Sequence, residues 1–232
     1  PAIQALQRYV DRQPTHDARA HYYIALSHRE LDDWRSALQH FNEVIATHPK
    51  DALWDDAWIE AAYTQWGWGG DYSSAIQTYL GFVEEASQHP TAPIALSDAA
   101  RAAERQGDIS KAARLWGRAA DEYPNASIAA RSAFLSGISL YREQALTKAL
   151  ARFEQAHALA SGDLPTGAAL VWMGKTQHAL GAEQKAIESW EAAANADPDG
   201  YYGLRAGELT DGFSPFLTDP AANLEFPAQE EQ

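Results

Sequence analysis

The feature that most constrains the fold of this chain is an internal repeat of about 37 residues. Five segments share an alanine followed four residues later by an aromatic residue. The pairs are Ala37/Phe41, Ala75/Tyr79, Ala112/Trp116, Ala149/Phe153 and Ala186/Trp190, and a truncated copy, Ala2/Leu6, precedes them. Successive alanines of the five pairs lie 38, 37, 37 and 37 residues apart. Repetition at this period is typical of proteins in which each unit is one supersecondary motif.

Two further positions of the repeat predict helical hairpins. A small residue lies twelve or thirteen residues before the alanine, at Ala25, Ala62, Ala100, Gly137 and Gly174. A proline lies twelve residues after it in several units, at Pro14, Pro49, Pro124 and Pro198. Facing small residues let two helices approach closely, and proline ends a helix, so each unit should be a pair of helices. Pro90 and Pro165 come three or four residues later, which predicts an extra turn in those second helices.

The repeats therefore predict an all-α fold, a right-handed α-solenoid of about five hairpins with partial repeats at both ends. The expected helix pairs are 17–31 with 34–47, 51–66 with 71–88, 92–106 with 108–122, 125–142 with 144–160, and 166–180 with 183–196. A remnant helix is expected at 3–12 and a last helix at 200–210. One hairpin cannot bury its own apolar face, so stacking should stabilise the array, with the first helices lining its concave face.

This organisation predicts three regions along the chain. The superhelix should cover 1–196, with 1–14 as the remnant of a preceding repeat. A capping helix should cover 197–212. Residues 213–232 contain three prolines, at 215, 220 and 227, and are expected to form a linker to a downstream domain. The order of small residue, alanine, aromatic and proline resembles the tetratricopeptide repeat, although the units are longer and lack a large aromatic early in the first helix.

Composition excludes several classes of function. The chain has 32 Asp and Glu against 18 Lys and Arg, a formal net charge of −14. Nucleic-acid binding and attachment to anionic lipids both need a cationic surface, so neither is expected. No apolar run is long enough to span a membrane. Cysteine is absent, which excludes disulfides, thiolate metal sites and cysteine nucleophiles.

The sequence predicts no catalytic residue, metal site or cofactor in this chain. Five of its eight histidines lie in the first 50 residues, yet no two histidines are four residues apart and no His-Glu-x-x-His motif occurs. A glycine-rich phosphate loop and a Gly-x-Ser-x-Gly elbow are both missing from the sequence. Adjacent carboxylates such as Asp55 and Asp56 point about 100° apart on a helix, so they do not converge on one bond.

An aromatic-rich stretch stands out between residues 54 and 72. Trp54 and Trp58 share a helical face, and we expect them to pack between repeats. Trp66 and Trp68 flank Gly67 in a lengthened turn, where two interpretations stay open. The two indoles either pack between repeats or form a contact patch for a glycan or a partner protein, because indole faces bind apolar surfaces.

The segment Asp197-Pro-Asp-Gly-Tyr-Tyr-Gly-Leu-Arg-Ala206, followed by Gly212-Phe-Ser-Pro-Phe216, resembles the end of the superhelical region of soluble lytic murein transglycosylases. The resemblance implies a non-catalytic scaffold outside the cytoplasm, in the periplasm or cell envelope. A downstream catalytic domain would cleave the bond between N-acetylmuramic acid and N-acetylglucosamine and leave a 1,6-anhydro product. Tyr201, Tyr202 and Arg205 would fix the last helix against the preceding repeat and that domain.

The resemblance also implies a set of partners. These are the chain's own downstream catalytic domain and a peptidoglycan glycan strand or its stem peptide, bound by a monomer. The repeats alone support an alternative of another class. In that alternative the chain is an adaptor that binds peptide segments, or assembles a protein complex, through its concave face.

Overall fold

The computed structural model describes residues 2–10, 17–159, 164–165 and 167–212. In these residues the chain forms twelve α-helices and no strand. The helices are α1 (Ala2–Val10), α2 (Ala18–Glu30), α3 (Trp34–Thr47), α4 (Trp54–Gly67), α5 (Tyr72–Glu85), α6 (Ala92–Gln106), α7 (Ile109–Glu122), α8 (Ala129–Arg142), α9 (Leu146–Ala158), α10 (Ala168–Ala179), α11 (Glu183–Ala196) and α12 (Tyr201–Thr210). The predicted all-α fold of stacked hairpins is confirmed. The predicted tail, 213–232, lies outside the described residues.

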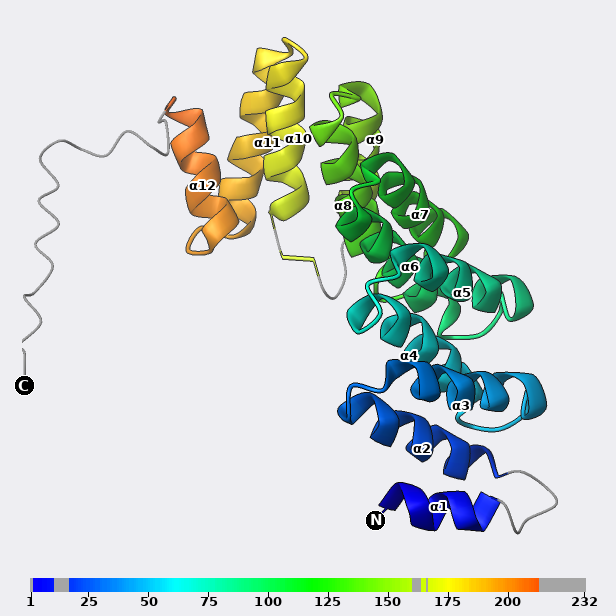
Figure 1. Cartoon of the computed structure of the whole chain (residues 1–232). Coiled ribbons are helices and arrows are strands. Elements are labelled where there is room, and N and C mark those ends of the chain that lie inside the picture. Colours follow the sequence, from blue (N-terminus) through cyan, green and yellow to red (C-terminus); the bar gives the residue numbers. More distant parts are fainter. Residues whose placement is uncertain (1, 11–16, 160–163, 166, 213–232) are drawn as a thin grey trace, which may run out of the picture. The chain divides into compact units, whose positions relative to one another are not determined.

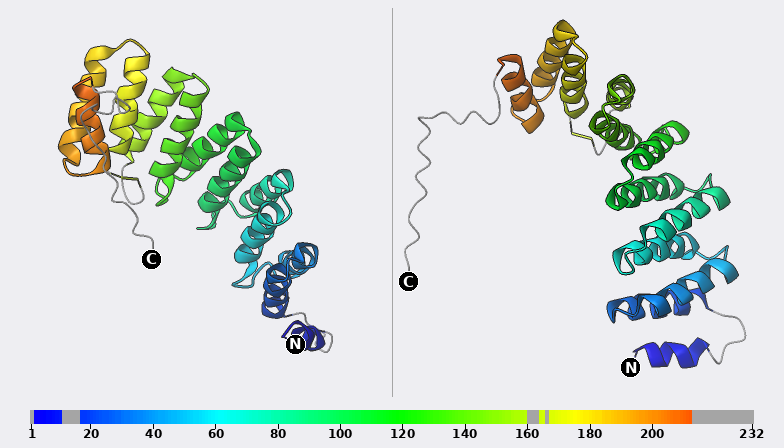
Figure 2. Two further views of the ribbon diagram at one scale, coloured as in Figure 1. Left: turned by 60° about the vertical axis from the view of Figure 1, so that its left-hand side comes forward. Right: turned by 45° about the horizontal axis from the view of Figure 1, so that its top comes forward.

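The chain divides into two compact units, residues 1–164 with α1 to α9 and residues 165–232 with α10 to α12. Within each unit every helix packs against the next one along the chain (Figure 1). In the first unit the hairpins are α2/α3, α4/α5, α6/α7 and α8/α9. Figure 1 shows α4, α6 and α8 along one side of this unit and α5, α7 and α9 along the other, and Figure 2 shows the stacking in two more views.

The repeat alanines and aromatics form the centre of each hairpin. All five alanines are buried without measurable exposure, and the five aromatic side chains are also buried. The ring of Phe153 lies against Gly137, and the indole of Trp190 lies against Gly174 and donates to the carbonyl oxygen of Val171 at 3.2 Å. The small residue of the first helix therefore receives the aromatic of the second helix in the same hairpin.

Aspartates define where several second helices begin. Asp33, Asp71 and Asp108 each accept a hydrogen bond from the backbone N–H three residues later. This bond satisfies one of the free donors in the first helical turn. Hydrogen bonds from Ser36 and Ser74 lower the pKa of Asp33 and Asp71, respectively.

Four second helices end at the same repeat position, eleven residues after the alanine. The capping residues are His48, Ala86, Tyr123 and Asp197, and each leaves the helical conformation while its N–H still bonds four residues back. A following proline explains this in three cases, since it disfavours helical geometry in the residue before it. Ala86 ends α5 in the same way without one, so the extra turn predicted from Pro90 is wrong. The turn predicted from Pro165 is wrong as well, because α9 ends at Ala158.

The segment between a second helix and the next first helix forms two successive turns, and this arrangement recurs along the chain. After α3, the N–H of Asp51 bonds to His48 and the N–H of Trp54 bonds to Asp51. The same spacing recurs after α5 and after α7. These turns explain why α4 and α8 begin three and four residues later than the sequence predicts.

In the second unit, α10, α11 and α12 share one small core. Leu170, Val171, Trp190 and Ala206 are buried in it, and Tyr202 packs at its edge. The last helix, predicted at 200–210, runs from Tyr201 to Thr210.

Candidate functional site

One face of each first helix in the first unit stays at least partly exposed, although Leu26 and Leu135 on it also pack against the core. Counted from the small repeat residue, its positions are −6, −2, +1 and +5, which follow one another at intervals of four, three and four residues and so share a helical face. They are Arg19, Tyr23, Leu26 and Glu30 on α2; Asp56, Glu60, Tyr63 and Gly67 on α4; Ile94, Asp98, Arg101 and Arg105 on α6; and Arg131, Leu135, Ile138 and Arg142 on α8. None of these residues is buried. We call this set the first-helix surface.

Large apolar side chains are exposed on this surface of α2, α4 and α6 and not on the second helices of the four hairpins, α3, α5, α7 and α9. Tyr23, Tyr63 and Ile94 on α2, α4 and α6 are 45%, 40% and 45% exposed. Among the described residues of α3, α5, α7 and α9, no large hydrophobic side chain is exposed. Single exposed apolar side chains are ordinary, but their restriction to one side of successive hairpins marks a surface suited to a partner.

Tyr63 lies at the centre of an aromatic group at the end of α4. Its ring makes edge contacts with Trp66 and Trp68, with ring centroids 5.1 and 5.4 Å apart. Trp66 also stacks near Tyr72 at 6.1 Å and donates its indole N–H to the hydroxyl of Tyr79 at 3.5 Å. The structure thus brings together the two tryptophans that the sequence singles out.

Both tryptophans also contact arginines from neighbouring hairpins. The guanidinium of Arg105 on α6 lies 5.3 Å from the ring centre of Trp66, and that of Arg29 on α2 lies 4.7 Å from Trp68. Each indole is half-buried. These cation–π contacts agree with packing between repeats, one of the two open interpretations. A direct contact of Trp66 and Trp68 with a ligand stays a prediction, and the most exposed ring of the group is Tyr63.

A largely buried ion pair joins α2 to α4 beneath this group. Arg29 pairs with Glu60 and also donates to the hydroxyl of Thr64 at 3.4 Å. Burial and, to a smaller extent, the charges of Glu60 and Asp56 together raise the pKa of Tyr22 to about 12. The carboxylates of α4 therefore face the aromatic side chains of α2.

Asp98 is the polar residue of the first-helix surface with the most unusual environment. Burial raises the pKa of its carboxyl, and the nearby charge of Arg101 opposes this rise. In the part of the chain that the structure describes, the carboxylate makes no hydrogen bond or ion pair. Such a group can accept a hydrogen bond from a peptide N–H or from a cation of a ligand.

The charges are segregated along the chain, which the net charge of the whole chain does not reveal. Residues 101–152 hold nine of the 18 Lys and Arg but only five of the 32 Asp and Glu. Among them, Arg101, Arg105 and Arg131 lie on the first-helix surface and form no ion pair with any described residue. A count of charges along the sequence, instead of over the whole chain, would have found this cationic segment.

The three residues predicted to dock a following domain lie on α12 with different exposures. Tyr201 is 73% exposed, while Tyr202 packs against the core of the second unit, and their rings meet edge-on at 5.0 Å. Arg205 pairs with Glu208 at 2.7 Å. Adjacent helical residues point in different directions, so one tyrosine packs while the other faces outward.

Three of the five histidines in the first 50 residues, His21, His28 and His40, lie together between α2 and α3. The Nδ1 atoms of His21 and His40 are 3.0 Å apart, and His28 stacks on His40 at 5.8 Å. Burial lowers the pKa of His40, and His21 and His28 lower it further. Across the described ranges, no group of three His, Cys, Asp or Glu residues could hold a metal ion, and no helix is long and apolar enough to cross a membrane.

Comparison with protein families places the chain among helical repeat proteins. The tetratricopeptide repeat family matches residues 19–51 and, in two overlapping windows, residues 69–127 and 97–163. These windows span more than half of the chain, so the chain belongs to the tetratricopeptide repeat family. The comparison with curated proteins gave no significant match.

Solved structures give the same fold. YrrB, described as a TPR protein with an unusual peptide-binding site, is 16% identical with a TM-score of 0.57, over 89% of this chain and 99% of YrrB. MamA is 16% identical with a TM-score of 0.55, over 78% of this chain and 92% of MamA. BtubC (BKLC) from P. vanneervenii is 14% identical with a TM-score of 0.55, over 96% and 93% of the two chains. These likenesses show the fold alone, and they lend no support to the resemblance to lytic transglycosylases.

Proposed function

We propose that this chain is a tetratricopeptide repeat adaptor that binds an extended peptide segment of a partner protein along the first-helix surface. The observation that carries this proposal is the row of exposed apolar side chains, Tyr23, Tyr63 and Ile94, on three successive first helices. Aromatic and aliphatic anchors of this kind supply most of the binding energy in protein interfaces. The peptide-binding site named for YrrB gives a precedent in the same fold.

The charges of the surface define what the segment should carry. Its apolar side chains would pack on Tyr63 and Ile94, which lie on adjacent hairpins. A backbone N–H or a cationic side chain would donate to Asp98, whose carboxylate has no described partner. Acidic side chains would meet Arg101 and Arg131. The preferred segment is therefore apolar at its centre and acidic at the end that lies over α6 and α8.

Panning a peptide-display library on the purified chain tests this proposal. Selected peptides should lose about tenfold in affinity when Tyr63→Ala or Ile94→Ala removes an anchor. Tyr201→Ala and Leu180→Ala are matched controls, because they remove exposed apolar side chains from the second unit. Equal affinity of all four variants for the selected peptides would contradict the proposal.

A scaffold of a lytic transglycosylase is the second candidate function. Two exposed apolar side chains on α12 favour it, since Tyr201 is 73% and Leu204 is 61% exposed, as a docking surface for a following domain requires. This candidate places the protein outside the cytoplasm. It expects the gene to encode, after the codon for Gln232, the motifs of that family's catalytic domain, Glu-Ser-x-Phe and Gly-Leu-Met-Gln. It also expects cell fractionation to recover the protein in the envelope. A gene without these motifs would eliminate it.

A further inference from the structure

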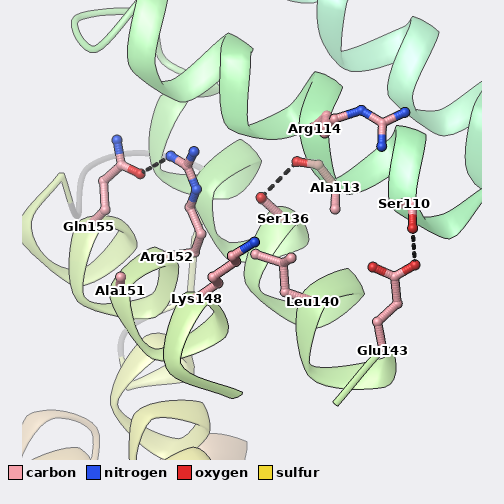
Figure 3. A pocket seen from close by; sticks show the side chains of 10 residues that line it. All are labelled: Ser110, Ala113, Arg114, Ser136, Leu140, Glu143, Lys148, Ala151, Arg152 and Gln155. Carbon is pink, nitrogen blue, oxygen red and sulfur yellow. Dashed lines mark hydrogen bonds between the residues drawn. The ribbon is translucent and has the colours of Figure 1, made fainter. Parts of the chain in front are cut away.

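A hollow of about 650 Å³ opens between α7, α8 and α9, on the side of α8 opposite to the first-helix surface. Its walls come from Ser110, Ala113, Arg114, Ser136, Leu140, Glu143, Lys148, Ala151, Arg152 and Gln155 (Figure 3). Ser136 and Leu140 lie one and three residues from Gly137, so they point away from Arg131, Leu135 and Ile138. The hollow is thus a separate site from the proposed peptide surface.

Small side chains create the space, and one arginine is fixed beside it. Arg152 crosses over Gly117, where a Cβ atom would stand 2.8 Å from Nη2. Its guanidinium binds both carboxylate oxygens of Asp121, at 2.6 and 2.9 Å, and donates to Gln155 at 2.7 Å. The same contact with Arg152 lowers the pKa of Asp121. Of the five N–H donors of Arg152, the one on Nε and one on Nη2 have no described partner.

Two other cations of the hollow have no counter-ion. Arg114 and Lys148 are exposed and form no ion pair within the described ranges. Figure 3 shows the ammonium of Lys148 between Leu140 and Ser136, with Arg114 on the far side of Ala113. The only lining carboxylate, that of Glu143, accepts a hydrogen bond from Ser110 at one edge. With Asp121, which already pairs with Arg152, three cations face two acids, so the hollow keeps a positive excess in a chain whose net charge is −14.

We propose that this hollow binds an acidic peptide segment, with an Asp or Glu side chain placed between Lys148 and Arg152. Charge-assisted hydrogen bonds from an ammonium and a fixed guanidinium are the strongest contacts available to a carboxylate. The volume accommodates a few side chains, and Leu140 and Ala151 offer an apolar wall for the methylene groups of Glu. Glu143 at the edge opposes ligands of higher negative charge, which favours a carboxylate over a phosphate.

Titration of the isotope-labelled full chain with acetyl-tetraglutamate-amide, followed by amide and arginine Nε NMR signals, tests this proposal. We expect saturable shifts of Ser136, Leu140 and Lys148 at millimolar peptide. Tetraglutamine amide is the uncharged control and should leave these signals in place. The shifts caused by tetraglutamate should disappear above about 0.5 M salt, because salt screens the attraction between exposed charges.

Variants that each remove one positive charge distinguish binding in the hollow from a general attraction of the acidic peptide to surface cations. Lys148→Gln should weaken tetraglutamate binding about tenfold, as expected for a lost charge-assisted hydrogen bond. Arg114→Gln should weaken it less, because Arg114 contributes its charge but no bond to the bound carboxylate. Lys185→Gln is the matched control, because it removes an exposed cation of α11 that forms no ion pair with any described residue, and it should change the affinity less than twofold. All three side chains are exposed, so the fold should tolerate each change.

Three results would overturn the proposal. The first is an absence of saturable shifts at Lys148, and the second is an equal effect of Lys185→Gln and Lys148→Gln. The third is displacement of tetraglutamate by inorganic phosphate at equal or lower concentration, which would show a site for simple anions.

Discussion

Phe153 packs so closely on Gly137 that a Cβ atom there would stand 2.6 Å from Cε1 of the ring. Replacing Gly137 with Ala should therefore destabilise the protein, even though Ala is the better helix former. The propensity gain is about 0.5–1 kcal/mol, whereas overpacking in a core costs about 1–3 kcal/mol. We expect a net loss of about 1–2 kcal/mol in urea unfolding.

Gly207 on α12 is the control for this prediction, since a Cβ atom there meets nothing within 4 Å. Gly207→Ala should leave stability unchanged or raise it by up to about 1 kcal/mol. If Gly137→Ala were as stable as Gly207→Ala, the close packing of Phe153 on the helix backbone would be refuted.

The ion pair between Arg29 and Glu60 predicts that the stability of the protein depends strongly on both residues. Arg29→Met should cost about 2–3 kcal/mol, because it leaves the partly buried carboxylate of Glu60 without its cation. The double variant Arg29→Met with Glu60→Met should recover most of this loss, since no unpaired charge remains. Urea unfolding of the two single variants and the double variant measures the coupling. A coupling energy near zero would contradict the role assigned to this pair.

The histidine group predicts a loss of stability in mild acid. Because the pKa of His40 is lowered in the folded protein, the unfolded chain binds the proton more readily. The contribution of His40 to stability is complete above its ordinary pKa of 6.5. This contribution is lost as the pH falls from 6.5 toward the lower pKa of the folded protein. Urea midpoints measured between about pH 7.5 and 5.5 should fall less steeply for His40→Gln than for the wild type.

His157 on α9 is exposed and serves as the control for this pH effect. His157→Gln should keep the slope of the wild type. Identical slopes for His40→Gln and the wild type would show that the group at His40 does not couple protonation to folding.

Replacing Asp98 with Asn should stabilise the protein and weaken its binding of peptides. The pKa of Asp98 is raised by burial, so the folded state binds the proton more readily and stability falls as pH rises through the carboxyl range. Asp98→Asn should raise stability at pH 7 by about 1 kcal/mol, and the gain should vanish below about pH 4. The same variant should weaken binding of the panned peptides. A variant that is less stable than the wild type at pH 7 would contradict this account.

The hairpin map follows from the sequence because its signals are local. The spacing of alanine, aromatic and small residue fixes which helix faces meet, and the aspartate caps mark helix starts. The sequence overestimates the length of α5 because Pro90 is the first proline after it, whereas the chain leaves the helix at Ala86, four residues earlier. Only the conformation at Ala86, which is the same as at His48, reveals this.

The sites were harder to predict because their contacts join neighbouring repeats. Arg29 meets Glu60, Arg152 meets Asp121 and Ser110 meets Glu143, at separations of 31, 31 and 33 residues. Each separation is four to six residues shorter than the 37-residue repeat, so the candidate partners of a residue lie at offset positions of the neighbouring repeat. Which of the candidates actually touch depends on how the hairpins stack, and the sequence alone does not specify this.

The most direct test of the central claim is amide NMR mapping of a panned peptide on the full chain. The account predicts that the largest shifts fall on α2, α4 and α6 around Tyr23, Tyr63 and Ile94, and that Tyr63→Ala reduces them at equal peptide concentration. Shifts confined to the second helices, α3, α5 and α7, or an undiminished response of Tyr63→Ala, would contradict the first-helix surface as the binding site.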